Sequence, residues 1–481
     1  MGEQSSVATR SRAGTSGIGF PAVRYALRIG CALAVLSLAL PAGAEGQEEH
    51  GDGGHHAALA TEAIPLQVEA IPDRPAPLIE LGERHLSPGE LSDGIEIPGG
   101  AVWRPALWVF GTYRTAAQTF DAGPVTNGDW AHRLDLFGNL RLSGSERIVI
   151  GFQPLDQFGG VGYQFGDGVE HGWQDDFNGR LRTLFFEGDI GELLPFLDDD
   201  DSGSWDIGFS VGRQDFFAQE GVLIADNLDL VGLTRNSLRP PGLGLTNLRL
   251  TGLFAWNGLH RNNVLDTSAR MLALLSEIDL PASTIAIDAI YTLADETTGD
   301  AFHAGIGVIQ RIGRFNTGFR LNVSLPVEGE TAAVTRGAVA FSEVSWSPWV
   351  SHDVYYVNTF LALGAFSPAA MDLGGPLGRT GILFEAAGMG RFGSPLSSLA
   401  ARAVGGAIGR QFFFDGDRRQ LVVELAGRKD TNGIDDGAAA LGVRLQQALG
   451  RRFILRMDGF AAARQSRDDS LGGRIETLVK F

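Results

Sequence analysis

The sequence of 481 residues is 44% hydrophobic, has a mean hydropathy of +0.03 and carries a net charge of −18 at pH 7. After residue 45 it contains no run of 18 or more apolar residues, which excludes a protein that crosses a membrane with helices. The negative charge, without a basic patch interleaved with aromatic residues, excludes nucleic-acid binding. The 66 glycines and 29 phenylalanines instead favour a large protein built from many strands.

Residues 1–44 have the organisation of an export signal. A basic region that includes Arg24 and Arg28 precedes the apolar run from Cys31 to Leu40, and Ala42-Gly43-Ala44 supplies a small-residue cleavage site. The apolar run is too short for a lasting membrane anchor. We therefore predict a secreted chain whose mature form has no cysteine.

Residues 45–100 are rich in proline and acidic residues, which favours an extended periplasmic arm or a plug for the structure that follows. His50, His55 and His56 stand among carboxylates in this segment and are candidate ligands for Zn²⁺, Ni²⁺ or Cu²⁺. The glycines between them equally fit a solvated linker. Further along, Asp198 to Asp201 could hold Ca²⁺, but the run lacks the alternating ligand spacing of known calcium loops and better fits solvated acids.

From residue 101 to the end, apolar and polar residues alternate. In residues 132–142, four leucines share one face while arginine, aspartate and asparagine share the other, and residues 315–325 repeat the pattern. Such alternation is typical of strands whose side chains point to two different environments. Its persistence favours a transmembrane antiparallel up-and-down β-barrel, with an apolar outside and a polar lumen, because a closed barrel leaves no unpaired edge.

We expect about 18 strands, with 16 as the alternative if residues 221–233 form a loop. The strands are expected near residues 105–118, 131–143, 146–156, 178–189, 204–217, 221–233, 246–257, 268–279, 283–293, 301–311, 315–325, 335–347, 353–364, 399–413, 419–428, 437–447, 452–464 and 471–481. Both termini should then lie at the periplasmic end, with the short turns. The long segments 157–177 and 365–398 should lie at the outer end, and the second could either fold into the lumen or remain on the surface.

The chain ends in Phe481, preceded at alternate positions by Val479, Ile475 and Gly473. This ending resembles the signal that the outer-membrane barrel assembly machinery reads. We therefore expect that machinery to be a partner, together with outer-membrane lipid.

The sequence shows no nucleophile elbow, zinc-protease, Walker or Rossmann pattern, and the histidines outside the arm stand alone. We therefore expect neither enzymatic activity nor a cofactor. The polar faces of the clearest strands are instead rich in arginine. The candidate pore-lining residues are Arg133, Asp135, Arg141, Arg147, Arg249, Arg314, Arg320, Glu424, Arg428, Arg444, Arg456 and Asp458.

Val211-Gly212-Arg213-Gln214, followed by Asp226-Asn227 and by Thr234-Arg235-Asn236-Ser237, resembles the alginate-export family of outer-membrane barrels. That resemblance implies an 18-stranded pore with an arginine-rich lumen that passes an anionic sugar polymer outward.

Together these features predict a channel in the outer membrane of a Gram-negative bacterium for small hydrophilic solutes, anionic ones such as sugar acids in particular. One alternative is an alginate-like polysaccharide exporter, and another is a barrel scaffold that holds a partner protein. A homotrimer is compatible with either kind of pore.

Overall fold

The computed structural model describes residues 76–82, 92–121, 125–155, 161–167, 171–174, 177–198, 203–349, 351–432 and 436–481. The predicted export signal and most of the predicted arm, including His50, His55 and His56, lie outside these ranges. Within them, no helix is long and apolar enough to cross a membrane.

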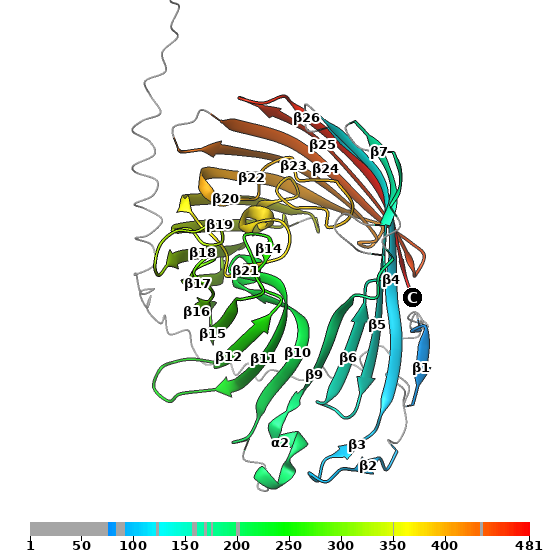
Figure 1. Cartoon of the computed structure of the whole chain (residues 1–481), viewed down its shortest axis with the longest axis vertical. Helices are drawn as coiled ribbons and strands as arrows, with labels where there is room; N and C mark the ends of the chain where they lie inside the picture. The colour runs from blue at the N-terminus through cyan, green and yellow to red at the C-terminus, as the bar shows by residue number, and fades with distance from the viewer. Residues whose placement is uncertain are drawn as a thin grey trace, which may run out of the picture. The chain divides into compact units, whose positions relative to one another are not determined.

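In the described ranges, 18 strands form one closed antiparallel barrel, as the alternation predicted (Figure 1). Each strand pairs with the next along the chain, and the last pairs with the first, Leu471 lying opposite Asp121. The strands are β4 (Ala106–Asp121), β5 (Thr126–Arg141), β6 (Arg147–Phe152), β9 (Leu181–Asp189), β10 (Ile207–Ala218), β11 (Ile224–Leu238), β12 (Asn247–Asn257), β15 (Arg270–Asp279), β16 (Ser283–Leu293), β17 (Ala301–Ile312), β18 (Phe315–Pro326), β19 (Gly337–Trp346), β20 (Val354–Ala365), β22 (Ala401–Phe414), β23 (Arg419–Asp430), β24 (Gly437–Leu449), β25 (Phe453–Arg464) and β26 (Ser470–Lys480).

The strand count depended on residues 221–233, most of which form β11. The 18-strand prediction is therefore confirmed, and the 16-strand alternative is wrong. The segment predicted as a long loop at 157–177 also contains two short strands, β7 (Val161–Gly166) and β8 (Gly172–Gln174). β7 pairs with the half of β5 that β6 is too short to reach, so the edge of β5 is not left open.

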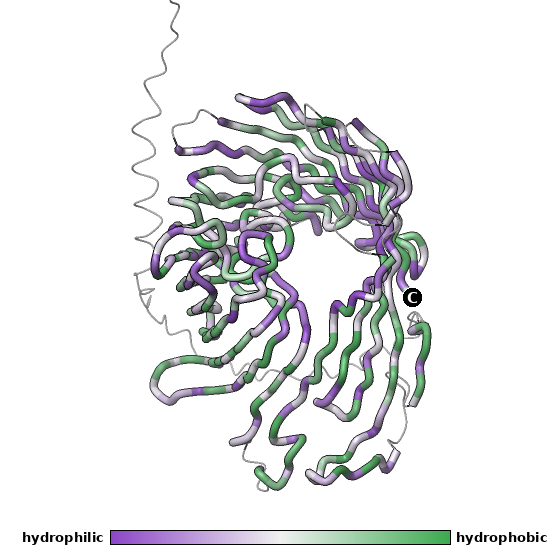
Figure 2. The backbone as a smooth tube through the Cα atoms, in the orientation of Figure 1, coloured by the Kyte–Doolittle hydropathy of each residue, from purple (hydrophilic) through white to green (hydrophobic). Residues whose placement is uncertain are grey.

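The alternation follows from the two environments of the barrel wall. On β23, Leu425 is 56% exposed whereas its neighbour Glu424 is fully buried, and on β26 Ile475 and Glu476 differ in the same way. Hydropathy alternates along many of the strands in Figure 2. The apolar side chains cover the outside, where lipid would meet them, and the polar ones face the lumen.

Aromatic side chains gather on the outer face at the end of the barrel where β4 begins and β26 ends, as in the belts that barrels place at membrane interfaces. The ring of Trp346 lies 5.7 Å from that of Phe315 and 5.6 Å from that of Tyr355, centroid to centroid. Near the opposite end, Trp130 and Trp173 lie 5.8 Å apart. The chain is therefore a β-barrel of the outer-membrane type.

The shorter elements lie mostly at the two ends of the barrel. The connection from β9 to β10 holds a single helical turn, α2 (Ile190–Leu193), and a 3₁₀ turn, η1 (Pro195–Leu197). The remaining short strands are β1 (Ile79–Leu81), β2 (Ile95–Glu96), β3 (Val102–Trp103), β13 (His260–Arg261) and β14 (Val264–Leu265). β1, from the predicted arm, pairs with β4, Ile79 lying opposite Val109.

Candidate functional site in the lumen

The connection between β20 and β22, the long loop (residues 366–400), folds into the barrel. It contains β21 (Ala370–Met371) and η3 (Pro376–Thr380). Glu424 on the wall accepts hydrogen bonds from the backbone N–H groups of Ile382 and Leu383, at 3.0 and 2.9 Å. Of the two alternatives left open for this segment, the folded-in one is therefore correct.

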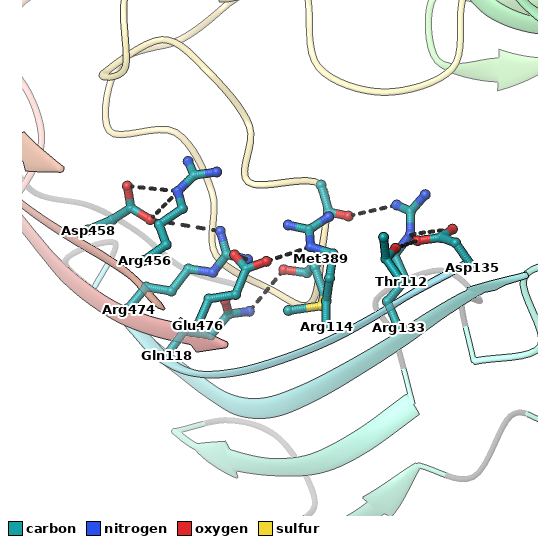
Figure 3. Close-up of polar contacts among 11 residues, drawn as sticks. Thr112, Arg114, Gln118, Arg133, Asp135, Met389, Arg456, Asp458, Arg474 and Glu476 are labelled. Carbon is teal, nitrogen blue, oxygen red and sulfur yellow. Dashed lines mark hydrogen bonds and ion pairs between the residues drawn. The ribbon is translucent and has the colours of Figure 1, made fainter. Parts of the chain in front are cut away.

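Further wall side chains bind the backbone of the long loop. Gln118 on β4 donates to the carbonyl of Met389 at 3.0 Å (Figure 3), and Asp129 on β5 accepts from the N–H of Arg391 at 2.9 Å. Arg428 donates to two loop carbonyls, those of Ser397 and Leu399. Because these contacts use the backbone of the loop, they do not depend on the loop side chains at these positions.

A second segment, the inner hairpin (residues 219–223) between β10 and β11, also enters the lumen. Its 3₁₀ turn η2 (Gln219–Gly221) has positive φ at all three residues. The Gln219 amide donates to Asp288 on β16 at 2.8 Å, and Leu223 is fully buried. β11 pairs in parallel with β21, Ile224 lying opposite Ala370, so this hairpin and the long loop are in direct contact.

Beneath the long loop, six consecutive strands of the closed wall each contribute an arginine on the lumen face to a single row. Asp458 separates two of them in the sheet, lying opposite Arg444 on one side and Arg474 on the other, and Arg114 lies opposite Arg133. Figure 3 shows much of this arginine row below the loop segment that carries Met389. The row consists of Arg428, Arg444, Arg456, Arg474, Arg114 and Arg133.

Three carboxylates stand within the arginine row. Asp458 accepts from Arg444 at 2.6 Å and from Arg456 at 3.0 Å. Glu476 pairs with both Arg474 and Arg114 at 2.5 Å. Asp135 pairs with Arg133 at 3.1 Å and also accepts from Gln153. Two further carboxylates flank the row: Asp430 pairs with Arg428 at 3.0 Å, and Glu385 of the long loop pairs with Arg444 at 2.7 Å. The six guanidinium groups of the row are therefore ion-paired with five carboxylates.

Other candidate pore-lining residues lie on the lumen side but away from the row. Arg147 pairs with Glu187 at 2.5 Å, and Arg249 pairs with Glu277 at 3.3 Å. The guanidinium of Arg141 lies 5.5 Å from the ring centre of Trp108.

Two candidates do not lie as the alternation suggested. Arg314 lies in the turn between β17 and β18, because Gly313, with a φ of 59°, reverses the chain there, and its guanidinium lies over the Phe315 ring. Glu424 is on the lumen face of β23 but is covered by the long loop. It therefore holds the loop and does not itself line an open passage.

Sequence reasoning missed Arg114 and Arg474 of the row, and Glu476 between them. Arg474 and Glu476 alternate with Gly473 and Ile475 in the last strand, so the pattern used for the terminal signal could have located them. Arg114 gave no such signal, because its strand also carries aromatic residues on the lumen face.

Asp226, His260 and Asp372 converge from β11, from the β12–β15 connection and from the long loop. Asp226 accepts from the backbone N–H and from Nδ1 of His260, at 2.7 and 2.9 Å, and this contact raises the pKa of His260. His260 Nε2 lies 3.6 Å from Asp372, which also pairs with Arg182 at 3.0 Å. Since protein donors already engage these carboxylates, we interpret the trio as a link between segments.

The candidate calcium run is described only at its first member. Asp198 accepts a hydrogen bond from the backbone N–H of Gly203 at 3.2 Å, and residues 199–201 lie outside the described ranges.

No family model and no curated protein matches the sequence. Solved structures do match. A BenF-like porin from Pseudomonas fluorescens Pf-5 has a TM-score of 0.54 and 10% identity, covering 78% of this chain and 98% of that one. The chain has the fold of an outer-membrane porin.

Two further matches are Pseudomonas aeruginosa porins with carboxylates. OccK2 (OpdF) in complex with glucuronate has a TM-score of 0.54 and 10% identity, and OpdK with vanillate has a TM-score of 0.51 and 12% identity. Both alignments cover 78% of this chain and 98% of the other. These matches do not support the resemblance to the alginate-export family. Arg213 of that motif makes two hydrogen bonds to Asp229, at 2.6 and 2.7 Å.

Proposed function

We propose that the protein is an outer-membrane channel through which small hydrophilic anions, and sugar acids in particular, diffuse. The observation that carries the proposal is the arginine row along the lumen wall. Guanidinium groups stay charged at any physiological pH and bind carboxylates in forked pairs. A permeant anion that moves along the row can exchange one guanidinium partner for the next.

The net charge of −18 does not oppose this proposal, because position matters more than the total. Charges on exposed loops are screened within about 8–10 Å at physiological ionic strength. Charges on the lumen wall act at contact distance on any ion that passes. The glucuronate found with OccK2 and the vanillate found with OpdK are carboxylates that fit a lumen of this kind.

The two alternatives are less well supported. A polysaccharide exporter needs a wide passage, whereas the long loop and the inner hairpin both project into this lumen. A scaffold for a partner protein needs an empty barrel, and here the described segments of the chain itself pack inside, with Leu223, Leu377 and Phe384 fully buried.

The proposal is tested with three sugars of nearly equal size and different charge. Liposomes that contain the purified barrel are loaded with labelled glucuronate, glucose or glucosamine, and the efflux of each is timed in buffered KCl. We expect glucuronate to leave fastest and glucosamine slowest, with protein-free liposomes as the control. Faster efflux of glucosamine, or equal efflux from protein-free liposomes, would contradict the proposal.

A further inference from the structure

Four charged side chains form a closed ring where the inner hairpin meets the long loop. Arg320 on β18 and Arg379 in η3 each contact both Glu220 of the hairpin and Glu343 on β19. Arg320 lies 3.3 Å from Glu220 and is also ion-paired with Glu343. Arg379 lies 3.0 Å from each of the two glutamates. The ring therefore holds two guanidinium groups with a carboxylate on either side.

The two carboxylates are not equivalent. Glu343 is part of the barrel wall, and its side chain is 19% exposed. Glu220 is at the tip of the hairpin, and its side chain is 48% exposed. The backbone of Gln219 and Glu220 is left-handed, with φ of 49° and 54°, a conformation that non-glycine residues adopt only when their surroundings impose it. Because its side chain is more exposed and belongs to a short turn, whereas Glu343 belongs to a strand of the wall, Glu220 is the more easily displaced of the two.

Space for a solute lies directly beside Glu220. A cavity of about 350 Å³ is lined by Glu220 and Arg320, together with Arg249, Thr251 and Asp288. This volume is within the range of small-molecule sites. The Arg320 side chain is only 4% exposed while Glu220 is in place. A carboxylate that enters the cavity therefore meets the glutamate before it meets the arginine.

We propose that Arg320 and Arg379 form a carboxylate-binding site that Glu220 occupies as an internal substitute until a solute carboxylate displaces it. Two guanidinium groups around one carboxylate are the arrangement that forked recognition of such a ligand requires. Arg379 also donates to the backbone carbonyl of Glu220 at 2.9 Å. The hairpin tip can therefore stay attached to the long loop while the Glu220 side chain moves away. The inference rests on the proposed function, because it takes the solute to be an anion.

The test measures how glucuronate blocks the current through single channels of the purified barrel in a planar bilayer. Glu220→Gln removes the competing charge and leaves both arginines in place. We expect glucuronate to block this variant at a concentration about tenfold lower than it blocks the unmodified protein, which corresponds to about 1.4 kcal/mol. Glucose should block neither protein. Adding Arg379→Gln to the variant should abolish the gain.

Glu277→Gln is the matched control, because Glu277 lines the same cavity but is ion-paired with Arg249. This substitution removes the same charge but leaves Glu220 between the two arginines. We therefore expect glucuronate to block the Glu277→Gln channel at nearly the same concentration as the unmodified protein. If the blocking concentration fell equally in both variants, the inference would be overturned, because the loss of any negative charge in the cavity would then explain the stronger block. The inference would also be overturned if glucuronate blocked the Glu220→Gln channel at the same concentration as the unmodified protein.

Folding of each variant is checked by its heat-modifiable migration on a gel. If Glu220→Gln does not fold, Glu220→Asp provides the test, because it keeps the charge and shortens its reach. It should give a smaller gain of the same sign, and no gain would overturn the inference. Failure of the proposed function would look different, since the unmodified channel would then prefer cations in a salt gradient.

Discussion

The long loop and the inner hairpin both enter the lumen, but they are held there in different ways. The loop is bound through its backbone by wall side chains such as Glu424 and Gln118. The hairpin is bound through its own side chains, Gln219 and Glu220, on a left-handed backbone. The backbone contacts of the loop are therefore encoded in the strands around it, and its side chains Asp372 and Arg379 add ion pairs with the wall. The hairpin depends more on its own two side chains.

The largest effect is expected when the wall loses its central contact with the long loop. Glu424→Ala leaves the N–H groups of Ile382 and Leu383 without this acceptor and also removes the partner of the Tyr356 hydroxyl. Hydrogen bonds to a charged group contribute about 1.5–3 kcal/mol each, so the loop should detach from this part of the wall. Single-channel conductance should rise, and proteases should cleave within residues 377–397.

Glu385→Gln is the control for that variant, because Glu385 belongs to the same loop but is half exposed and ion-paired with Arg444. Exposed ion pairs contribute about 0–1 kcal/mol, so its conductance should change little. If Glu424→Ala kept both its conductance and its resistance to proteases, the backbone contacts would not be what holds the loop.

A smaller and more local effect is expected in the inner hairpin. Gln219→Ala removes the amide that donates to the buried carboxylate of Asp288. A buried polar group that loses its partner costs about 1–3 kcal/mol. Hydrogen exchange should accelerate at residues 219–224 and stay slow at residues 382–391. Acceleration in the long loop instead would show that the two segments are held as one unit.

The smallest effect concerns the link between the two segments, and it depends on pH. Asp226 raises the pKa of His260 above its ordinary value of 6.5. A raised pKa in the folded state means that the charged imidazole contributes its full stabilisation below the ordinary pKa. The contribution disappears as the pH rises through the raised value.

Hydrogen exchange of residues 366–375 should therefore accelerate as the pH is raised above about 6.5, after correction for the intrinsic dependence of exchange on pH. His260→Gln should remove this additional acceleration. A profile that is the same with and without His260 would mean that the histidine does not link the segments.

The strands were predictable because lipid and water impose a strict alternation on the wall. Residues 315–325 and 453–464 show it clearly and form β18 and β25 almost as expected. β4 shows it poorly because Trp108 and Phe110 lie on its lumen face, and Arg114 was missed for that reason.

The interior of the barrel was harder to predict, since it depends on contacts between distant parts of the chain. Glu424 looks like a lumen acid until the long loop, about forty residues earlier in the chain, is known to cover it. Alternation assigns a side chain to one face of a strand but does not show what packs against that face. The ring around Glu220 joins the inner hairpin, β18, β19 and the long loop, and no local pattern marks it.

The central claim is that the arginine row selects anions although the chain as a whole is acidic. It is tested most directly by the reversal potential of the purified barrel in a planar bilayer under a KCl gradient. We expect the sign that indicates a preference for chloride. Arg444→Gln should shift the potential toward zero, whereas Arg314→Gln, which changes the turn outside the row, should leave it unchanged. A preference for potassium, or an Arg444→Gln channel as selective as the unmodified one, would contradict the account.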